Sequence, residues 1–271
     1  MMILNDGISK NFEGKYDFDY TQDLDLDIIN LSKDSSGIRQ TPELTYFYTY
    51  KFNENANKQD IKEFRTLFKH NFNDSEYFYK DSVMDFIELG MLRMDNYMKL
   101  EDFDIVFMTD FGHGDTAGVM SVLDSLLLEY TNGAFLDFRL VKATYEKVKF
   151  DKEKAKNALM STEKYKDEFD EEDAVNQIDK EFNRMKKQGS IFKMKRFMPV
   201  IGRCGFYDFL EFETPRHEQI FRKMVNGTKA LICDDFITSG STVKEAKRYL
   251  HSINPNVDMT VFVLIDQLRE Y

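Results

Sequence analysis

Two adjacent carboxylates stand just before a run of small, mostly hydroxylated residues in the stretch 230–242, ALICDDFITSGST. Asp234 and Asp235 follow an apolar run that is typical of a buried strand, and a helical pattern begins at residue 242. Between them we expect a turn built from five small residues, which are Thr238, Ser239, Gly240, Ser241 and Thr242. A loop that only connected two elements would not need this order of acids, hydroxyls and glycine.

The chemistry of this stretch fits a sugar phosphate. The N-terminus of a helix presents unpaired N–H groups with partial positive charge, which suits a phosphate. Gly240 would let the backbone approach that phosphate, and the neighbouring hydroxyls would add hydrogen bonds. Asp234 and Asp235 would be repelled by the phosphate, so as acceptors they fit a pair of neighbouring hydroxyls. The stretch therefore predicts a site for a ribose 5-phosphate.

Strands and helices alternate over the C-terminal part of the chain. We expect strands at 103–108, 134–141, 229–234 and 257–265, a weaker strand at 197–202, and helices at 117–130 and 242–252. This alternation predicts an α/β fold with a mainly parallel sheet. Ligands of such sheets bind at the carboxyl ends of the strands, where Asp234 and Asp235 would emerge.

Two further regions complete the expected organisation. Residues 1–100 form an N-terminal extension, in which 1–40 suggest a loosely ordered arm, 43–52 a half-buried strand, and 58–100 mainly helix with a second helix at 81–92. Residues 101–271 form the α/β domain. Within it, residues 143–196 are strongly charged and poor in apolar side chains, so we expect a helical insertion that projects from the sheet.

The segment CDDFITSGST resembles the phosphoribosyl-pyrophosphate-binding motif of the type I phosphoribosyltransferases. The resemblance implies that Asp234 and Asp235 hold the ribose 2- and 3-hydroxyls, with an indirect contact to Mg²⁺ through the bound substrate, and that residues 238–242 hold the 5-phosphate. A plain strand end with a Ser/Thr helix cap would explain Ser241 or Thr242 but not the whole order. The likeness covers about residues 100–271, and only the 230–242 motif is specific.

The resemblance also implies a pyrophosphate-binding loop after the first strand of the α/β domain. Its expected contacts are Gly112, His113 and Gly114, although a turn with a surface histidine is an equal alternative. Asp110 and Asp115 depart from the family's pattern, because a diphosphate tolerates carboxylates only with Mg²⁺ between them.

The family carries a mobile basic loop after the second strand, which neutralises the departing pyrophosphate. Lys142 is the leading candidate for that cation, and Arg139 is the second. The run FRLVKAT followed by KEKAKNAL is faintly similar to the competence-factor branch of the family. The length of the 143–196 insertion leaves open a partner-binding or dimer-contact role.

The bulk composition narrows the classes of function. The net charge of −11 argues against broad binding to nucleic-acid backbones, which requires clustered positive charge. No apolar run approaches the roughly 20 residues that span a bilayer. The two cysteines form neither a disulfide framework nor a zinc cluster, and we expect a reduced, cytoplasmic compartment.

Two functions remain open at this point. The first is an enzyme that transfers the phosphoribosyl group to a nitrogenous base, not identified by the sequence, with Mg²⁺ as cofactor and with a homodimer as the expected assembly. The second is a non-catalytic regulatory or structural protein that keeps the fold. A cation opposite the 234–242 stretch would favour the first, and Lys142 or Arg139 pointing away from it, with Asp110 filling the diphosphate space, would favour the second.

Overall fold

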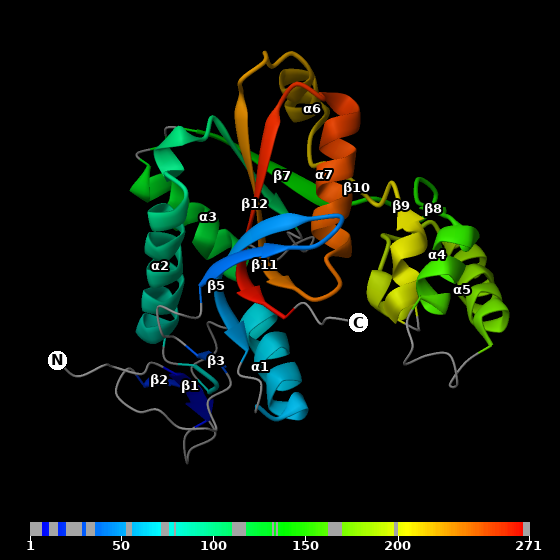
Figure 1. Cartoon of the computed structure of the whole chain (residues 1–271), viewed down its shortest axis with the longest axis horizontal. Helices are drawn as coiled ribbons and strands as arrows, with labels where there is room; N and C mark the ends of the chain where they lie inside the picture. The colour runs from blue at the N-terminus through cyan, green and yellow to red at the C-terminus, as the bar shows by residue number, and fades with distance from the viewer. Residues whose placement is uncertain are drawn as a thin grey trace.

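The computed structural model contains one large mixed sheet with helices on both faces and a lobe beside it (Figure 1). It describes residues 7–10, 16–19, 29–30, 36–52, 56–71, 76–78, 80–109, 118–131, 133, 135–161, 170–197 and 200–267. Among these residues, no helix has the length and apolar character needed to cross a membrane.

Five parallel strands form the centre of the sheet, in the order β7-β6-β11-β12-β5. Their bounds are β5 (Thr45–Phe52), β6 (Ile105–Thr109), β7 (Leu136–Lys142), β11 (Lys229–Ile237) and β12 (Asp258–Asp266). Antiparallel strands flank them on both sides: β10 (Leu210–Phe212) beside β7, and β4 (Gly37–Gln40), β3 (Ile29–Asn30), β1 (Gly7–Lys10) and β2 (Tyr16–Asp19) beyond β5. The predicted α/β fold with a parallel core is therefore confirmed.

The helices cover the two faces of the sheet through separate apolar clusters. One cluster joins the sheet to α1 (Lys58–Asn71), α2 (Lys80–Tyr97) and α3 (Val119–Tyr130). The other joins it to α6 (Pro215–Arg222) and α7 (Ser241–Ile253). Strand β6 is buried along its whole length, as expected of a central parallel strand between two helical layers.

The N-terminal part of the chain is more closely tied to the sheet than its sequence indicates. The predicted loose arm is wrong for the described residues, which form β1 to β4. Tyr16 is fully buried, and its ring stacks on Phe78 and meets Phe64 edge-on. Strand β5 pairs in parallel with β12, so the parallel core includes a strand from the range assigned to the N-terminal extension.

The charged insertion forms a compact helical lobe next to α7 (Figure 1). It contains α4 (Lys152–Met160) and α5 (Glu171–Lys186), and each helix begins at an aspartate whose carboxylate accepts a backbone N–H of the first turn. We expected poor apolar content in this range, but α5 has a buried apolar face. This face consists of Ala174, Val175, Ile178, Phe182 and Met185. An antiparallel pair of strands, β8 (Lys149–Phe150) and β9 (Phe206–Tyr207), lies at the base of the lobe. Because β9 follows residue 196, the lobe extends past the predicted end of the insertion.

The weak strand predicted at 197–202 is wrong for the described residues of that range, 197 and 200–202. The chain there follows 3₁₀ turns at Met194–Arg196 and Val200–Gly205. Tight packing against the lobe explains the difference: a Cβ at Gly202 would lie 2.6 Å from Ile178 Cδ1, and one at Gly205 would lie 2.6 Å from the Asp151 carbonyl oxygen. The described residues of this segment therefore pack against the lobe and do not pair in the sheet.

Candidate functional site

The candidate site lies where the chain changes direction across the parallel sheet. From β6 the chain passes through α3 to β7 on one side, and from β11 it passes through α7 to β12 on the other. Strands β6 and β11 are neighbours, so their carboxyl ends form a topological switch point. Such points are the usual ligand sites of open α/β sheets. The predicted 230–242 stretch occupies the β11 side of this point.

Asp234 and Asp235 lie inside β11, three and two residues before its end. We expected the strand to end at residue 234, but pairing with β12 continues to Ile237, which lies opposite Asp266. Asp234 is 4% exposed and Asp235 is 1% exposed. Asp234 Oδ1 accepts the N–H of Asp235 at 3.1 Å, and Asp235 Oδ1 accepts the N–H of Phe236 at 2.7 Å. Both carboxylates are thus held in fixed orientations near the carboxyl edge of the sheet.

The turn into α7 has the geometry that suits an anion. Gly240 is the N-cap residue of α7, with φ 70° and ψ 1°, a left-handed conformation that favours glycine. Because this cap residue has no side-chain oxygen, it leaves the N–H groups of the first helical turn to other partners. The hydroxyls of Ser239 and Ser241 are 2.9 Å apart and half-buried beside the turn. The structure therefore brings the predicted small residues together at a helix N-terminus.

Lys142 is brought to this turn from another strand. It is the last residue of β7, and its Nζ donates to Thr242 Oγ1 at 3.4 Å. The ammonium also lies 5.2 Å from the centre of the Phe209 ring. A cation from β7 and a hydroxyl from the first turn of α7 thus meet although 100 residues separate them in the chain.

Arg139 lies elsewhere, against α3. Its guanidinium pairs with Asp124 at 3.2 Å and lies 3.9 Å from Asp137. Helix α3 packs in the other apolar cluster from α7, so this arginine faces the opposite side of the sheet from the 238–242 turn. Burial, and then the charge of Asp137, raise the pKa of Asp124 to about 6, and burial raises the pKa of Asp137 as well.

The predicted pyrophosphate contacts, Gly112, His113 and Gly114, fall outside the described residues, as does Asp110. Their loop is bounded by two described residues. Thr109, at the end of β6, is fully buried, and no described residue hydrogen-bonds to its Oγ1. Gly118 is the N-cap residue of α3.

Lys69 is a contact of the site that the sequence did not predict. Its Nζ lies 2.8 Å from Asp235 Oδ1, although it comes from the last turn of α1, 166 residues away. The sequence predicted helix over this range, but no local signal marks Lys69 as a partner of β11. Only the packing of α1 against the sheet brings the two together.

Mg²⁺ prefers oxygen ligands, and the acid pair is the place where an indirect contact was expected. Asp235 Oδ1 already accepts from Lys69 and from the N–H of Phe236. Within the described ranges, no group of three His, Cys, Asp or Glu side chains is placed to share an ion.

A cleft of about 1180 Å³ opens between the 238–242 turn, α7 and the helical lobe. Its walls include Ser239, Ser241, Lys244, Lys154, Asn157 and Tyr207. The cleft therefore begins at the predicted phosphate turn and extends along α7 beneath the insertion.

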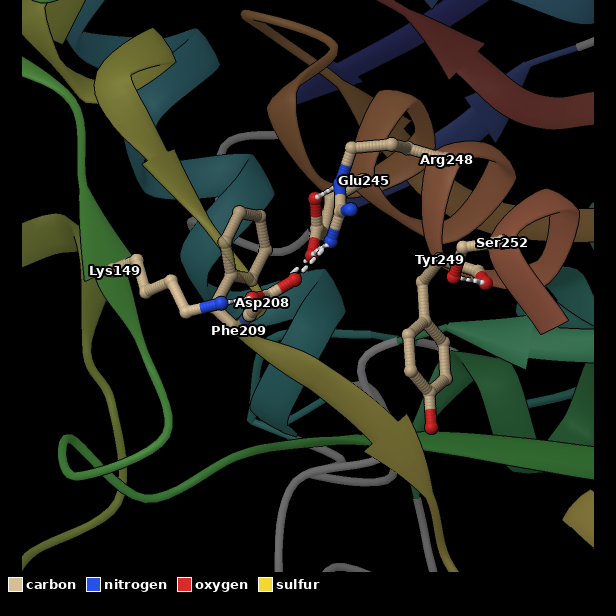
Figure 2. A network of polar contacts seen from close by, with 7 residues as sticks. All are labelled: Lys149, Asp208, Phe209, Glu245, Arg248, Tyr249 and Ser252. Atoms are coloured by element: carbon tan, nitrogen blue, oxygen red, sulfur yellow. Dashed lines mark hydrogen bonds and ion pairs between the residues drawn. The ribbon is translucent and has the colours of Figure 1, made fainter.

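Two residues that line the cleft, Glu245 and Arg248, belong to a polar network (Figure 2). The Asp208 carboxylate lies between Lys149 and Arg248 and pairs with both. Burial opposes its ionisation, but the hydrogen bonds from the two cations outweigh burial and hold the pKa of Asp208 below its ordinary value. Arg248 also binds both oxygens of Glu245, and Glu245 Oε1 accepts the N–H of Phe209. The network ties the base of the lobe to α7.

A comparison with known proteins finds no family model that matches the chain and no curated protein with significant similarity to its sequence.

Proposed function

We propose that the chain binds phosphoribosyl pyrophosphate with Mg²⁺ at the carboxyl ends of β6 and β11, as a protein with the type I phosphoribosyltransferase fold. The observation that carries the proposal is the joint placement of the acid pair, the left-handed Gly240 turn and Lys142 at one topological switch point. A plain helix cap would not need two buried acids before the turn or a lysine reaching it from another strand.

In this proposal the N–H groups of the first turn of α7 and the surrounding hydroxyls bind the 5-phosphate. Asp234 and Asp235 accept hydrogen bonds from the ribose hydroxyls, and their fixed orientation limits the entropy lost on binding. Lys142 donates to Thr242 in the turn, whereas Arg139 pairs with Asp124 by α3, so we assign to Lys142, and not to Arg139, the role of stabilising the leaving diphosphate.

The proposed reaction is transfer of the phosphoribosyl group to a nitrogenous base. A nitrogen lone pair attacks the anomeric carbon, the bond from that carbon to the diphosphate oxygen breaks, and pyrophosphate leaves with the electron pair while the new N–C adduct loses a proton. When bound, Mg²⁺ would neutralise part of the diphosphate charge. The chain itself supplies positioning and charge stabilisation, and the cleft beside the turn offers room for the acceptor under the helical lobe.

A second candidate function is a non-catalytic regulatory or structural role. It is favoured by the burial of Asp234 and Asp235, which leaves very little of either carboxylate accessible to a ligand, and by the pairing of Arg139 with Asp124 away from the turn. In that case the motif would serve a regulatory or structural protein, and fold alone does not decide between the two.

Pyrophosphate release separates the two functions. The wild type, Lys142→Met and Lys147→Met would be incubated with phosphoribosyl pyrophosphate, Mg²⁺ and a panel of purine, pyrimidine and pyridine bases. Lys147 is the matched control because it pairs with Glu211 and lies on the exposed surface. We expect base-dependent release by the wild type and by Lys147→Met, and a loss of about 100-fold for Lys142→Met. Ligand binding without release for any base would favour the second candidate.

A further inference from the structure

The ion pair between Lys69 and Asp235 joins the N-terminal part of the chain to the acid pair. The ammonium comes from the last turn of α1, the carboxylate is 1% exposed, and the Nζ–Oδ1 distance is 2.8 Å. A buried carboxylate without a partner is costly, because water no longer stabilises its charge. Lys69 therefore supplies the partner that this buried carboxylate needs.

The same residue also contacts the other side of the switch point. The carbonyl oxygen of Lys69 lies 3.6 Å from the place that a Cβ on Gly118 would take, so the last turn of α1 packs against the start of α3. Helix α3 follows the loop that leaves β6. Lys69 thus contacts β11 with its side chain and lies beside the N-cap of α3 with its backbone.

The position of the ammonium suits a role in ligand binding beyond stability. The Lys69 side chain is 26% exposed, whereas its partner is almost fully buried, so the pair is open to solvent on the lysine side. Asp235 Oδ1 is occupied by Lys69 and by the N–H of Phe236, which fixes the rotation of the carboxylate. The second oxygen, Oδ2, is thereby oriented for another donor.

We propose that Lys69 is a positioning residue for the ribose: its ion pair with Asp235 holds that carboxylate in one rotation, and its effect on ligand affinity passes through that carboxylate. This inference rests on the proposed function, because it takes a ribose hydroxyl as the donor to Asp235. It adds a residue from α1 to a site that the motif confines to β11 and α7.

A double-mutant cycle tests the proposal. Ribose 5-phosphate, and separately phosphoribosyl pyrophosphate with Mg²⁺, would be titrated calorimetrically into the wild type, Lys69→Met, Lys69→Arg, Asp235→Asn and the Lys69→Met/Asp235→Asn double variant. Lys152→Met is the control, because Lys152 forms a similar pair with Asp179 at 2.6 Å in the helical lobe. Circular dichroism melting would fix a temperature at which every variant is folded.

We expect Lys69→Met to weaken both ligands about tenfold, as for loss of one charged hydrogen bond. Lys69→Arg should restore most of the affinity, Lys152→Met should not change it, and the double variant should bind as Asp235→Asn does. Wild-type affinity in Lys69→Met, or multiplied effects in the double variant, would overturn the positioning role while leaving the proposed function intact. Absence of binding by the wild type would overturn both.

Discussion

Replacing Gly240 by alanine probes the turn that enters α7. Gly240 has φ 70°, and an added Cβ would lie 3.4 Å from Lys244 Cε and 3.6 Å from Ile237 Cδ1. Both distances are ordinary van der Waals contacts, so no clash contributes to the energy. The cost is that of a left-handed backbone with a Cβ, about 1–2 kcal/mol of unfolding free energy. Relaxation of the turn to avoid this cost would also move the first N–H groups of α7.

The control for this change is Gly227→Ala. Gly227 has φ 90°, nothing lies within 4 Å of its added Cβ, and it sits in the turn between α6 and β11. Urea unfolding should give a similar loss for both variants, because the backbone penalty is the same in kind. Calorimetric titration should show that only Gly240→Ala loses affinity for phosphoribosyl pyrophosphate, by about tenfold or more.

Two results would refute this reasoning. An unchanged unfolding free energy for Gly240→Ala would mean that residue 240 does not need the left-handed conformation. Equal losses of affinity in Gly240→Ala and Gly227→Ala would mean that the effect is a general consequence of destabilisation, and that the turn does not hold the ligand.

Three further predictions concern the surroundings of the site. The folded-state pKa of Asp124 is raised from 3.8 to about 6, so its contribution to stability is full below about pH 4 and is lost as the pH rises through 6. The loss is up to about 3 kcal/mol of unfolding free energy. Urea unfolding across about pH 4–8 should show this fall, and Asp124→Asn should flatten it. Glu245→Ala leaves the buried N–H of Phe209 without its acceptor and should lower the unfolding free energy by about 1–3 kcal/mol, whereas an unchanged melting curve would contradict the network in Figure 2. Gly205→Ala places a Cβ 2.6 Å from the Asp151 carbonyl oxygen and should cost about 1–3 kcal/mol, with faster limited proteolysis of the helical lobe as its readout.

The central architecture was predictable because its signals are local. The apolar runs of β6, β11 and β12 and the periodicity of α3 and α7 appear in short windows of sequence, and their alternation indicates a parallel α/β sheet. The Gly240 turn was predictable for the same reason, because a run of small residues stands between a strand pattern and a helix pattern.

The features that the sequence did not reveal depend on distant partners. The extension of β11 to Ile237 comes from its pairing with β12, and no residue near 237 signals it. The strands before residue 41 are short and depend on pairing with other strands, β3 and β4 with β5, and β1 with β2 and β3, so their own pattern is weak. The pairing of Lys69 with Asp235 depends on how α1 docks on the sheet, which residue types alone do not determine.

The central claim is that the 230–242 stretch binds phosphoribosyl pyrophosphate. The most direct test is calorimetric titration of that compound, with and without Mg²⁺, into the wild type and the Asp234→Asn/Asp235→Asn variant. We expect the wild type to bind the compound in a Mg²⁺-dependent manner. The variant lacks two charged acceptors for the ribose hydroxyls, so its affinity should be lower by at least about 100-fold. Equal affinity of the two proteins, or no binding by the wild type, would contradict the assignment of this site.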